Sequence, residues 1–278
     1  MNVRVRAALR LATWFLAAFL ALAVTGAAIG GAGAGNLTGY AIFDALLLVI
    51  SYACWRFLDR RKAGATPLAV NRGIAERTLH GALIGALLVA AVVGGLALAG
   101  IYGIAPRACR PEPLLRFVAG TAGFVALAAL FEEALFRGYA LFALRDMAGP
   151  AGAVGITAVL FAVAHKDNPG FGWTAGANLA LVGAVLAAWI LAERDIWVAV
   201  GAHAGWNAAV VLGAAVPVSG LAIPAPCHTG VLQGPDWLTG GSFGLEAALP
   251  TAVAWLGLAV WLRRGGWRRR AGSRDRVT

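Results

Sequence analysis

Long apolar stretches recur along the whole chain and are separated by short polar or Gly/Pro-containing segments. Most of these stretches are near the roughly 20 residues that an α-helix needs to cross a bilayer. Gly149 and Pro150 mark a break between two of them. The pattern therefore predicts an all-α, polytopic membrane protein with about eight transmembrane helices in one bundle. The predicted spans are 11–31, 40–58, 82–104, 117–146, 151–165, 175–191, 196–216 and 245–262.

The first apolar stretch has two interpretations. Arg4, Arg6 and Arg10 precede it, and small residues near 25–28 follow its apolar centre, as in a secretory signal peptide. The apolar run is longer than the core of a usual signal peptide, and this favours an uncleaved first helix.

Composition narrows the class of protein. Hydrophobic residues make up 60% of the 278 residues, charged residues only 13%, and the mean hydropathy is +0.76, which excludes an ordinary soluble globular protein. The net charge of +10 could indicate nucleic-acid binding. However, the basic residues lie in short runs beside apolar spans, where they determine membrane topology. We therefore expect the lipid bilayer as a partner and no nucleic acid.

The distribution of Lys and Arg predicts the orientation. The basic segments are the N-terminus, the loop 56–80, the connections after the fourth and sixth spans, and the C-terminal tail. The positive-inside rule then places both termini in the cytoplasm of a multi-pass cell-membrane protein, although Arg107, Arg110 and Arg116 fall on the predicted outer side. Within a single structural domain we distinguish 1–110 with three helices, 111–216 with helices four to seven, and 217–278 with an outer loop, the last helix and the tail.

Three charged residues stand out inside the apolar run from Phe117 to Leu144, which carries no other charge: Glu132, Glu133 and Arg137. A charge at the centre of a membrane helix costs roughly 2.5 to 3.5 kcal/mol on insertion scales and usually marks a functional position. Glu133 and Arg137 are four residues apart and can pair on one helix face. Glu132 points about 100° away and lacks that partner, as expected for a residue that handles a proton.

Two further pairs have the same four-residue spacing: Phe161 with His165, and His203 with Asn207. If a turn near residue 148 reverses the chain, Glu132 and His165 lie at the same depth, each about 25 Å from that turn. His203 and Asn207 begin one to two turns from the charged connection at 193–195. We therefore expect the three groups to meet in an intramembrane active-site cavity, because isolated burial in the bilayer would be costly.

The motifs Glu132-Glu133 with Arg137, Phe161 with His165, and His203 with Asn207 resemble the EExxxR, FxxxH and HxxxN motifs of the CAAX protease and bacteriocin-processing family of intramembrane endopeptidases. The resemblance covers about residues 114–216, and the first three spans and the last have no motif.

The resemblance implies roles for these residues in peptide-bond hydrolysis. Glu132 with His165 would polarise a water molecule, and His203 with Asn207 would stabilise the tetrahedral intermediate. Glu133, Arg137 and Phe161 would support them structurally. The substrate would be a membrane-associated or exported peptide or protein, with or without a prenyl group.

Other functions fit parts of the pattern. The same polar cluster could bind a ligand or relay protons in a scaffold or transporter, or lock helix packing as an ion pair. A zinc ion would need ligands from three helices, since no HExxH spacing is present, so we expect no metal or other cofactor. No serine lies in a nucleophile context, and the sequence leaves the oligomeric state open.

Two features lie outside the motifs. Cys109 and Cys227 both fall in predicted outer loops, which suggests a disulfide if that face is oxidising. Asp44, inside the second span, is interpreted as a packing residue or as part of the cavity edge.

Overall fold

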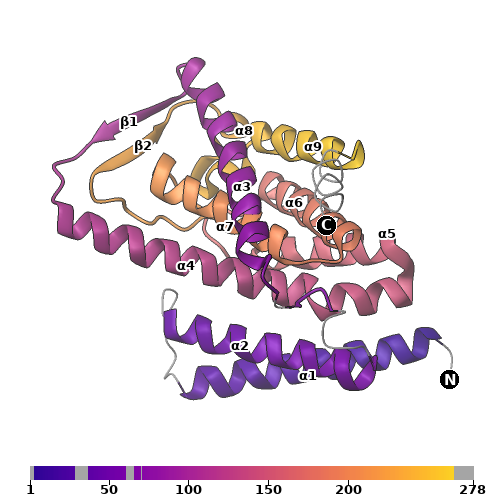
Figure 1. Ribbon diagram of the computed structural model, residues 1–278. Helices are drawn as coiled ribbons and strands as arrows, with labels where there is room; N and C mark the ends of the chain where they lie inside the picture. Colours follow the sequence, from indigo (N-terminus) through magenta and orange to yellow (C-terminus); the bar gives the residue numbers. More distant parts are fainter. Residues whose placement is uncertain (1–2, 29–36, 61–65, 70, 266–278) are drawn as a thin grey trace, which may run out of the picture.

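The computed structural model describes residues 3–28, 37–60, 66–69 and 71–265. The end of the first predicted span with most of the connection to the second (29–36), the basic residues Arg61 and Lys62, and the tail beyond 265 lie outside these ranges. Helices dominate the described chain (Figure 1) and confirm the all-α class. The long helices are α1 (Val3–Ala28), α2 (Leu37–Ala53), α3 (Ile74–Leu98), α4 (Pro111–Arg137), α5 (Tyr139–Ala164), α6 (Trp173–Glu193), α7 (Trp197–Ala208) and α9 (Leu249–Arg263).

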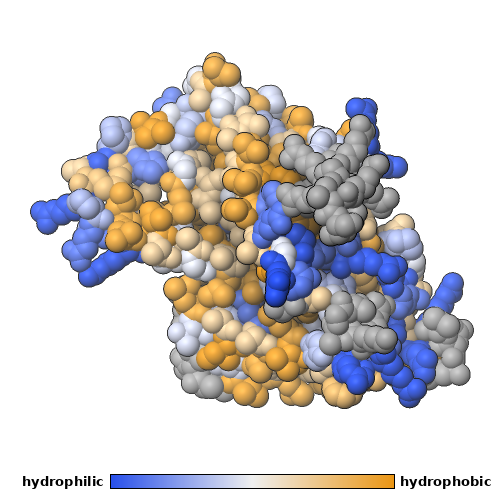
Figure 2. Space-filling model, in the orientation of Figure 1, coloured by the Kyte–Doolittle hydropathy of each residue, from blue (hydrophilic) through white to orange (hydrophobic). Residues whose placement is uncertain are grey.

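Six segments of the described chain are long and apolar enough to cross a membrane, and one of them, Pro111–Ala164, contains both α4 and α5. The helix α9 is also apolar but has only 15 residues. The predicted number of eight spans is therefore approximate, whereas the polytopic helical bundle is confirmed. Much of the visible surface is apolar, and hydrophilic residues gather at its left edge and in a patch that runs from the centre to the lower right (Figure 2).

The predicted fourth span, 117–146, is wrong as a single helix. The helix α4 ends at Arg137, and Gly138 leaves the helical conformation with φ −71° and ψ −120°. A Cβ at Gly138 would lie 2.3 Å from the carbonyl oxygen of Ala134, so this break needs glycine. The reversal occurs near the predicted place, because Gly149 has φ 77° and ψ 170° within α5 and the second half of α5 runs back beside α4 (Figure 1).

The predicted third span, 82–104, is displaced. The helix α3 begins at Ile74 and ends at Leu98, and Gly100 follows with φ 71°. The apolar residues after it form β1 (Tyr102–Pro106), which pairs antiparallel with β2 (His228–Leu232) in the register Tyr102↔Leu232. A short apolar run does not distinguish a strand from a helix end, and the strand partner lies in a distant loop.

Segments that were predicted to lie on one side of the membrane are found together. Arg10 of α1 forms ion pairs with Asp59, after α2, and with Asp146 of α5, the latter at 2.9 Å. Arg77 of α3 pairs with Asp195, between α6 and α7, at 2.8 Å. These contacts gather four basic segments at one end of the bundle, while the assignment of that end to the cytoplasm stays a prediction.

At the other end, a disulfide joins Cys109 to Cys227, with 4.7 Å between the Cα atoms. It bridges the chain just after β1 to the chain just before β2, as the two predicted outer loops suggested. The third cysteine, Cys54, is buried and free.

Thiol counting tests this bond. Alkylation of the denatured, unreduced protein is expected to modify one of its three cysteines, Cys54, and alkylation after reduction is expected to modify all three. Intact mass distinguishes the two results. Three modified cysteines without reduction would contradict the disulfide.

Candidate active site

An ion pair within α4 lies at one side of the site and supports it structurally. Glu133 and Arg137 are both 0% exposed, and Arg137 Nη1 donates to Glu133 Oε1. Arg137 also donates from Nε to the carbonyl oxygen of Gly183 in α6 at 3.3 Å. Its guanidinium lies 4.3 Å from the ring centroid of Phe161 in α5, a cation–π contact. One buried arginine thus fixes α4 against α5 and α6, and the partners within α4, α5 and α6 compensate the cost of burying its charge.

The helix α7, which carries His203, packs directly against the backbone of α3, because both helices have glycines where they cross. A Cβ added at Gly81 or Gly85 of α3 would lie 2.0 or 2.1 Å from carbonyl oxygens of α7, and one at Gly201 or Gly205 would meet α3 as closely. Paired small residues four apart let two membrane helices approach to backbone contact. His203 lies between the two glycines of α7, so this crossing determines where its ring can reach.

The tautomer of His203 follows from its partner. Nδ1 of His203 lies 2.9 Å from Glu133 Oε1, the oxygen that also accepts from Arg137. A carboxylate bound to a guanidinium is an acceptor, so Nδ1 carries a hydrogen and donates. Nε2 of His203 is therefore the nitrogen available for chemistry.

His165 is oriented in the same way from α5. It follows the last residue of that helix, and its Nδ1 lies 2.8 Å from the carbonyl oxygen of Phe161. A carbonyl oxygen can only accept, so Nδ1 of His165 donates, and a neutral His165 has a bare Nε2. Phe161 thus contacts both sides of the site, with its ring against Arg137 and its carbonyl oxygen on His165.

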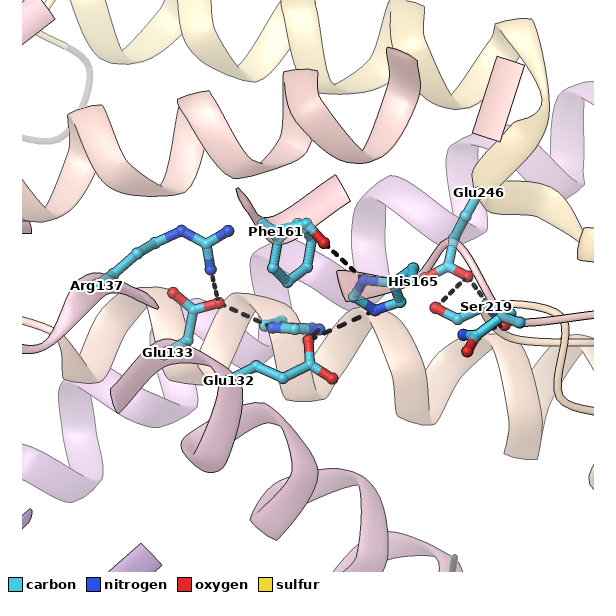
Figure 3. Close-up of polar contacts among 9 residues, drawn as sticks. Glu132, Glu133, Arg137, Phe161, His165, Ser219 and Glu246 are labelled. Atoms are coloured by element: carbon cyan, nitrogen blue, oxygen red, sulfur yellow. Dashed lines mark hydrogen bonds and ion pairs between the residues drawn. The ribbon is translucent and has the colours of Figure 1, made fainter. Parts of the chain in front are cut away.

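Both Nε2 atoms point to the same carboxylate oxygen. Glu132 Oε2 lies 3.9 Å from Nε2 of His165 and 3.7 Å from Nε2 of His203, and Figure 3 shows the Glu132 carboxylate facing His165. These separations are too long for direct hydrogen bonds but suit a bridging water. Oε2 is buried and accepts no hydrogen bond from any described residue. Glu132 of α4, His165 directly after α5 and His203 of α7, up to 71 positions apart in the chain, therefore converge on one point.

Asn207 and Asp44 are less closely tied to this point. Asn207 lies one turn after His203 on α7, and its buried Oδ1 has no hydrogen-bond partner in the described part of the chain. Asp44 is 2% exposed in α2, and neither carboxylate oxygen has a hydrogen-bond partner among the residues described. Within those same residues, no group of three or more His, Cys, Asp or Glu side chains is arranged to hold a metal ion.

The structure adds two residues to the neighbourhood for which the sequence predicted no role, Ser219 and Glu246. Figure 3 shows them beside His165, on the side away from Arg137. One signal could have identified Glu246. It is the only charged residue in the predicted span 245–262, which is the same kind of isolated acid that singled out Glu132.

Comparison with known families agrees with these motifs. Residues 114–209 match the family model described as Type II CAAX prenyl endopeptidase Rce1-like, and this range contains all four candidate catalytic residues. Comparisons with curated proteins and with solved structures returned no match. The match implies CAAX endopeptidase activity in general. The chain is thus similar to this family over residues 114–209, which confirms the resemblance to the CAAX protease family that the three motifs indicated.

Proposed function

We propose that this chain is an intramembrane endopeptidase that hydrolyses peptide bonds with a water molecule activated by Glu132 and His165. The observation that carries the proposal is the convergence of Glu132 Oε2 with the Nε2 atoms of His165 and His203 at 3.7–3.9 Å. In this proposal, one water binds between Glu132 Oε2 and the two Nε2 atoms. The site lies among apolar helices, which suits a substrate that is itself membrane-associated.

The two hydrogens of the water limit the roles that Glu132, His165 and His203 can have. A water can donate only two hydrogen bonds, so it cannot satisfy three bare acceptors at once. If Glu132 is ionised and His165 is neutral, these two groups accept both water hydrogens and leave an oxygen lone pair free to attack. His203, whose Nδ1 already donates to Glu133, then takes part as an imidazolium with a hydrogen on Nε2. The ionised Glu133 compensates that charge.

The reaction then balances without a covalent intermediate. Glu132 removes a proton from the water while the water oxygen attacks the carbonyl carbon of the scissile bond. The oxyanion that forms accepts hydrogen bonds from His203 Nε2 and from the amide of Asn207, and such preorganised donors stabilise the transition state. Glu132 passes its proton to the leaving nitrogen, and the products are a carboxylic acid and an amine. Glu133, Arg137 and Phe161 hold the reacting groups and touch no reacting atom.

We further propose that no metal is required, that the substrate is a membrane-associated or exported peptide or protein, prenylated or not, and that both termini are cytoplasmic. The basic end gathered around Arg10 and Arg77 supports the orientation. The scaffold or transporter interpretation leaves the hydrogen-bonded orientation of both histidines toward Glu132 without a role.

The test uses purified protein in nanodiscs with a panel of fluorogenic peptides, prenylated and not. Wild type is expected to release peptide products, and His165→Ala is expected to lower kcat by about 10²-fold, because the water loses one of its two acceptors. Each reaction is repeated with a chelator, which is expected to have no effect. Thermal unfolding measures whether the variant is folded.

Different results would contradict different parts of the proposal. Chelator inhibition that added zinc reverses would replace the metal-free mechanism with a zinc-dependent one. A folded His165→Ala protein that cleaves as fast as wild type would remove this site from the reaction. Wild-type protein that binds membrane peptides without cleaving any would favour the scaffold or transporter function.

A further inference from the structure

The segment 217–248, between α7 and α9, covers the end of the site that lies beyond His165. Its two inner residues contact each other, since Ser219 donates to Glu246 Oε2 both from its backbone N–H and from Oγ, the latter at 2.9 Å. Glu246 is only 7% exposed. This carboxyl group lines the same cavity as His203 and lies beside His165 (Figure 3), although it belongs to a part of the chain that has no motif.

Glu246 is held from several sides. Asn178 of α6 donates to the backbone carbonyl oxygens of Glu246 and Ala248 at 2.8 and 2.9 Å. Asn168, three residues after His165, donates to the carbonyl oxygen of Ser219 at 2.8 Å. These contacts connect the turn after His165 to Glu246 through Ser219. The position of the carboxyl is therefore fixed relative to the site.

Ser219 has a backbone conformation that its neighbours must maintain. Its φ is 47°, in the left-handed region, which is uncommon for a residue other than glycine. Such conformations cost of order 1–3 kcal/mol, persist only where the surroundings enforce them, and concentrate at functional sites. In this conformation both the N–H and the Oγ of Ser219 point at one carboxylate oxygen.

A small cavity of about 20 Å³ separates Glu246 from the catalytic side, and its lining includes Phe161, His203, Trp206, Ser219 and Glu246. That volume suffices for about one water molecule, and the lining offers polar partners on both sides. Glu246 also interacts electrostatically with both His165 and His203. Burial disfavours the ionised form of the Glu246 carboxyl, whereas the hydrogen bonds from Ser219 and the charge of a protonated histidine favour it.

We propose that Glu246 is a positioning residue of the proteolytic site, which controls the charge of the His165–His203 pair from the side opposite Glu132. This inference rests on the proposed function. The groups that act on the pair are Glu132, Glu133 and Arg137 from α4 and Glu246 from the covering segment, and the residues of α6 and α9 that hold this segment, Asn178 and Thr251, are neutral. An ionised Glu246 stabilises the imidazolium that His203 needs as an oxyanion donor.

The proposal predicts the sign of a pH shift. Glu246→Gln keeps the shape of the side chain and an acceptor for Ser219 but removes the negative charge. Protonated imidazoles then lose a stabilising partner, so both limbs of the pH profile of kcat are expected to move to lower pH, by about one pH unit. Glu246→Asp retains the charge, and its profile is expected to stay at the wild-type position even if kcat falls.

Two further variants complete the experiment. Asp236→Asn removes an exposed acid of the same covering segment and is expected to leave the profile unchanged. Ser219→Ala keeps the carboxyl but removes one donor to it, which disfavours its ionised form, so a smaller shift in the same direction is expected. This variant provides the test if Glu246→Gln does not fold.

The outcomes separate this proposal from the one on which it rests. A uniform fall in kcat without a pH shift, in Glu246→Gln and in Ser219→Ala, would reduce Glu246 to a structural role and overturn the inference. If the proposed function itself were wrong, the result would differ: the wild type would cleave no peptide, or the His165→Ala variant would be fully active.

Discussion

Replacing Glu132 with glutamine is expected to lower kcat by about 10³-fold, with little change in KM. The amide has the size of the carboxyl and can still accept a hydrogen bond from the water, but it cannot take up a proton. General-base catalysis by a positioned side chain contributes typically 10²- to 10⁴-fold. Glu132 Oε2 is buried and forms no hydrogen bond with any described residue, so it is free to bind the water. The measurement is steady-state cleavage of the best peptide of the panel.

The matched control is Glu112→Gln, the same substitution in the first turn of the same helix, α4. Glu112 forms an exposed ion pair with Arg116, with a side-chain exposure of 74%, and such pairs contribute little to stability. Its kcat is expected to stay within about twofold of wild type. If folded Glu132→Gln protein retained more than about a tenth of wild-type kcat, below the range for a general base, Glu132 would not be that base.

The second large effect is expected at the crossing of α3 and α7. In Gly85→Ala, the new Cβ would lie 2.1 Å from the carbonyl oxygen of Ala202 and 2.7 Å from the backbone nitrogen of Trp206. These are backbone atoms, so the two helices must separate. Overpacking of this kind costs about 1–3 kcal/mol in the free energy of unfolding, which lowers Tm by several degrees. Because His203 follows Ala202 directly, we also expect proteolysis to be lost.

Gly94→Ala is the control for that variant, nine residues further along the same helix. No atom lies within 4 Å of a Cβ at Gly94, and alanine stabilises a helix interior by up to about 1 kcal/mol relative to glycine. Thermal unfolding followed by tryptophan fluorescence is therefore expected to give an unchanged or raised Tm. Equal behaviour of the two variants would show that the crossing is looser than backbone contact.

The sequence predicted the bundle well because membrane spans are encoded locally, by apolar length and flanking charge. It failed where the outcome depended on contacts. To predict the break at Gly138, one would have to know that the carbonyl oxygen of Ala134 lies where a Cβ of residue 138 would be. To predict the strand Tyr102–Pro106, one would have to know its partner strand His228–Leu232, which lies 122 or more residues away in the chain.

The candidate site was predictable to a similar extent. Helical periodicity placed Glu133 with Arg137 and brought Glu132 level with His165, because depth in a helix is simple arithmetic. Periodicity could not reveal that Glu133 would also bind Nδ1 of His203, which assigns the tautomer. Nor could it place Glu246, whose approach to the histidines depends on the path of an irregular segment.

The position of Arg137 within α4 also bears on how the protein is made. The partners that Glu133 and Arg137 finally acquire, His203 and the carbonyl oxygen of Gly183, lie 70 and 46 residues further along the chain. At about 5–20 residues per second, the ribosome delivers them seconds after α4. The pairing of Glu133 with Arg137 in the same helix lets α4 enter the bilayer with these two charges already neutralised, before any other helix has arrived to accept them.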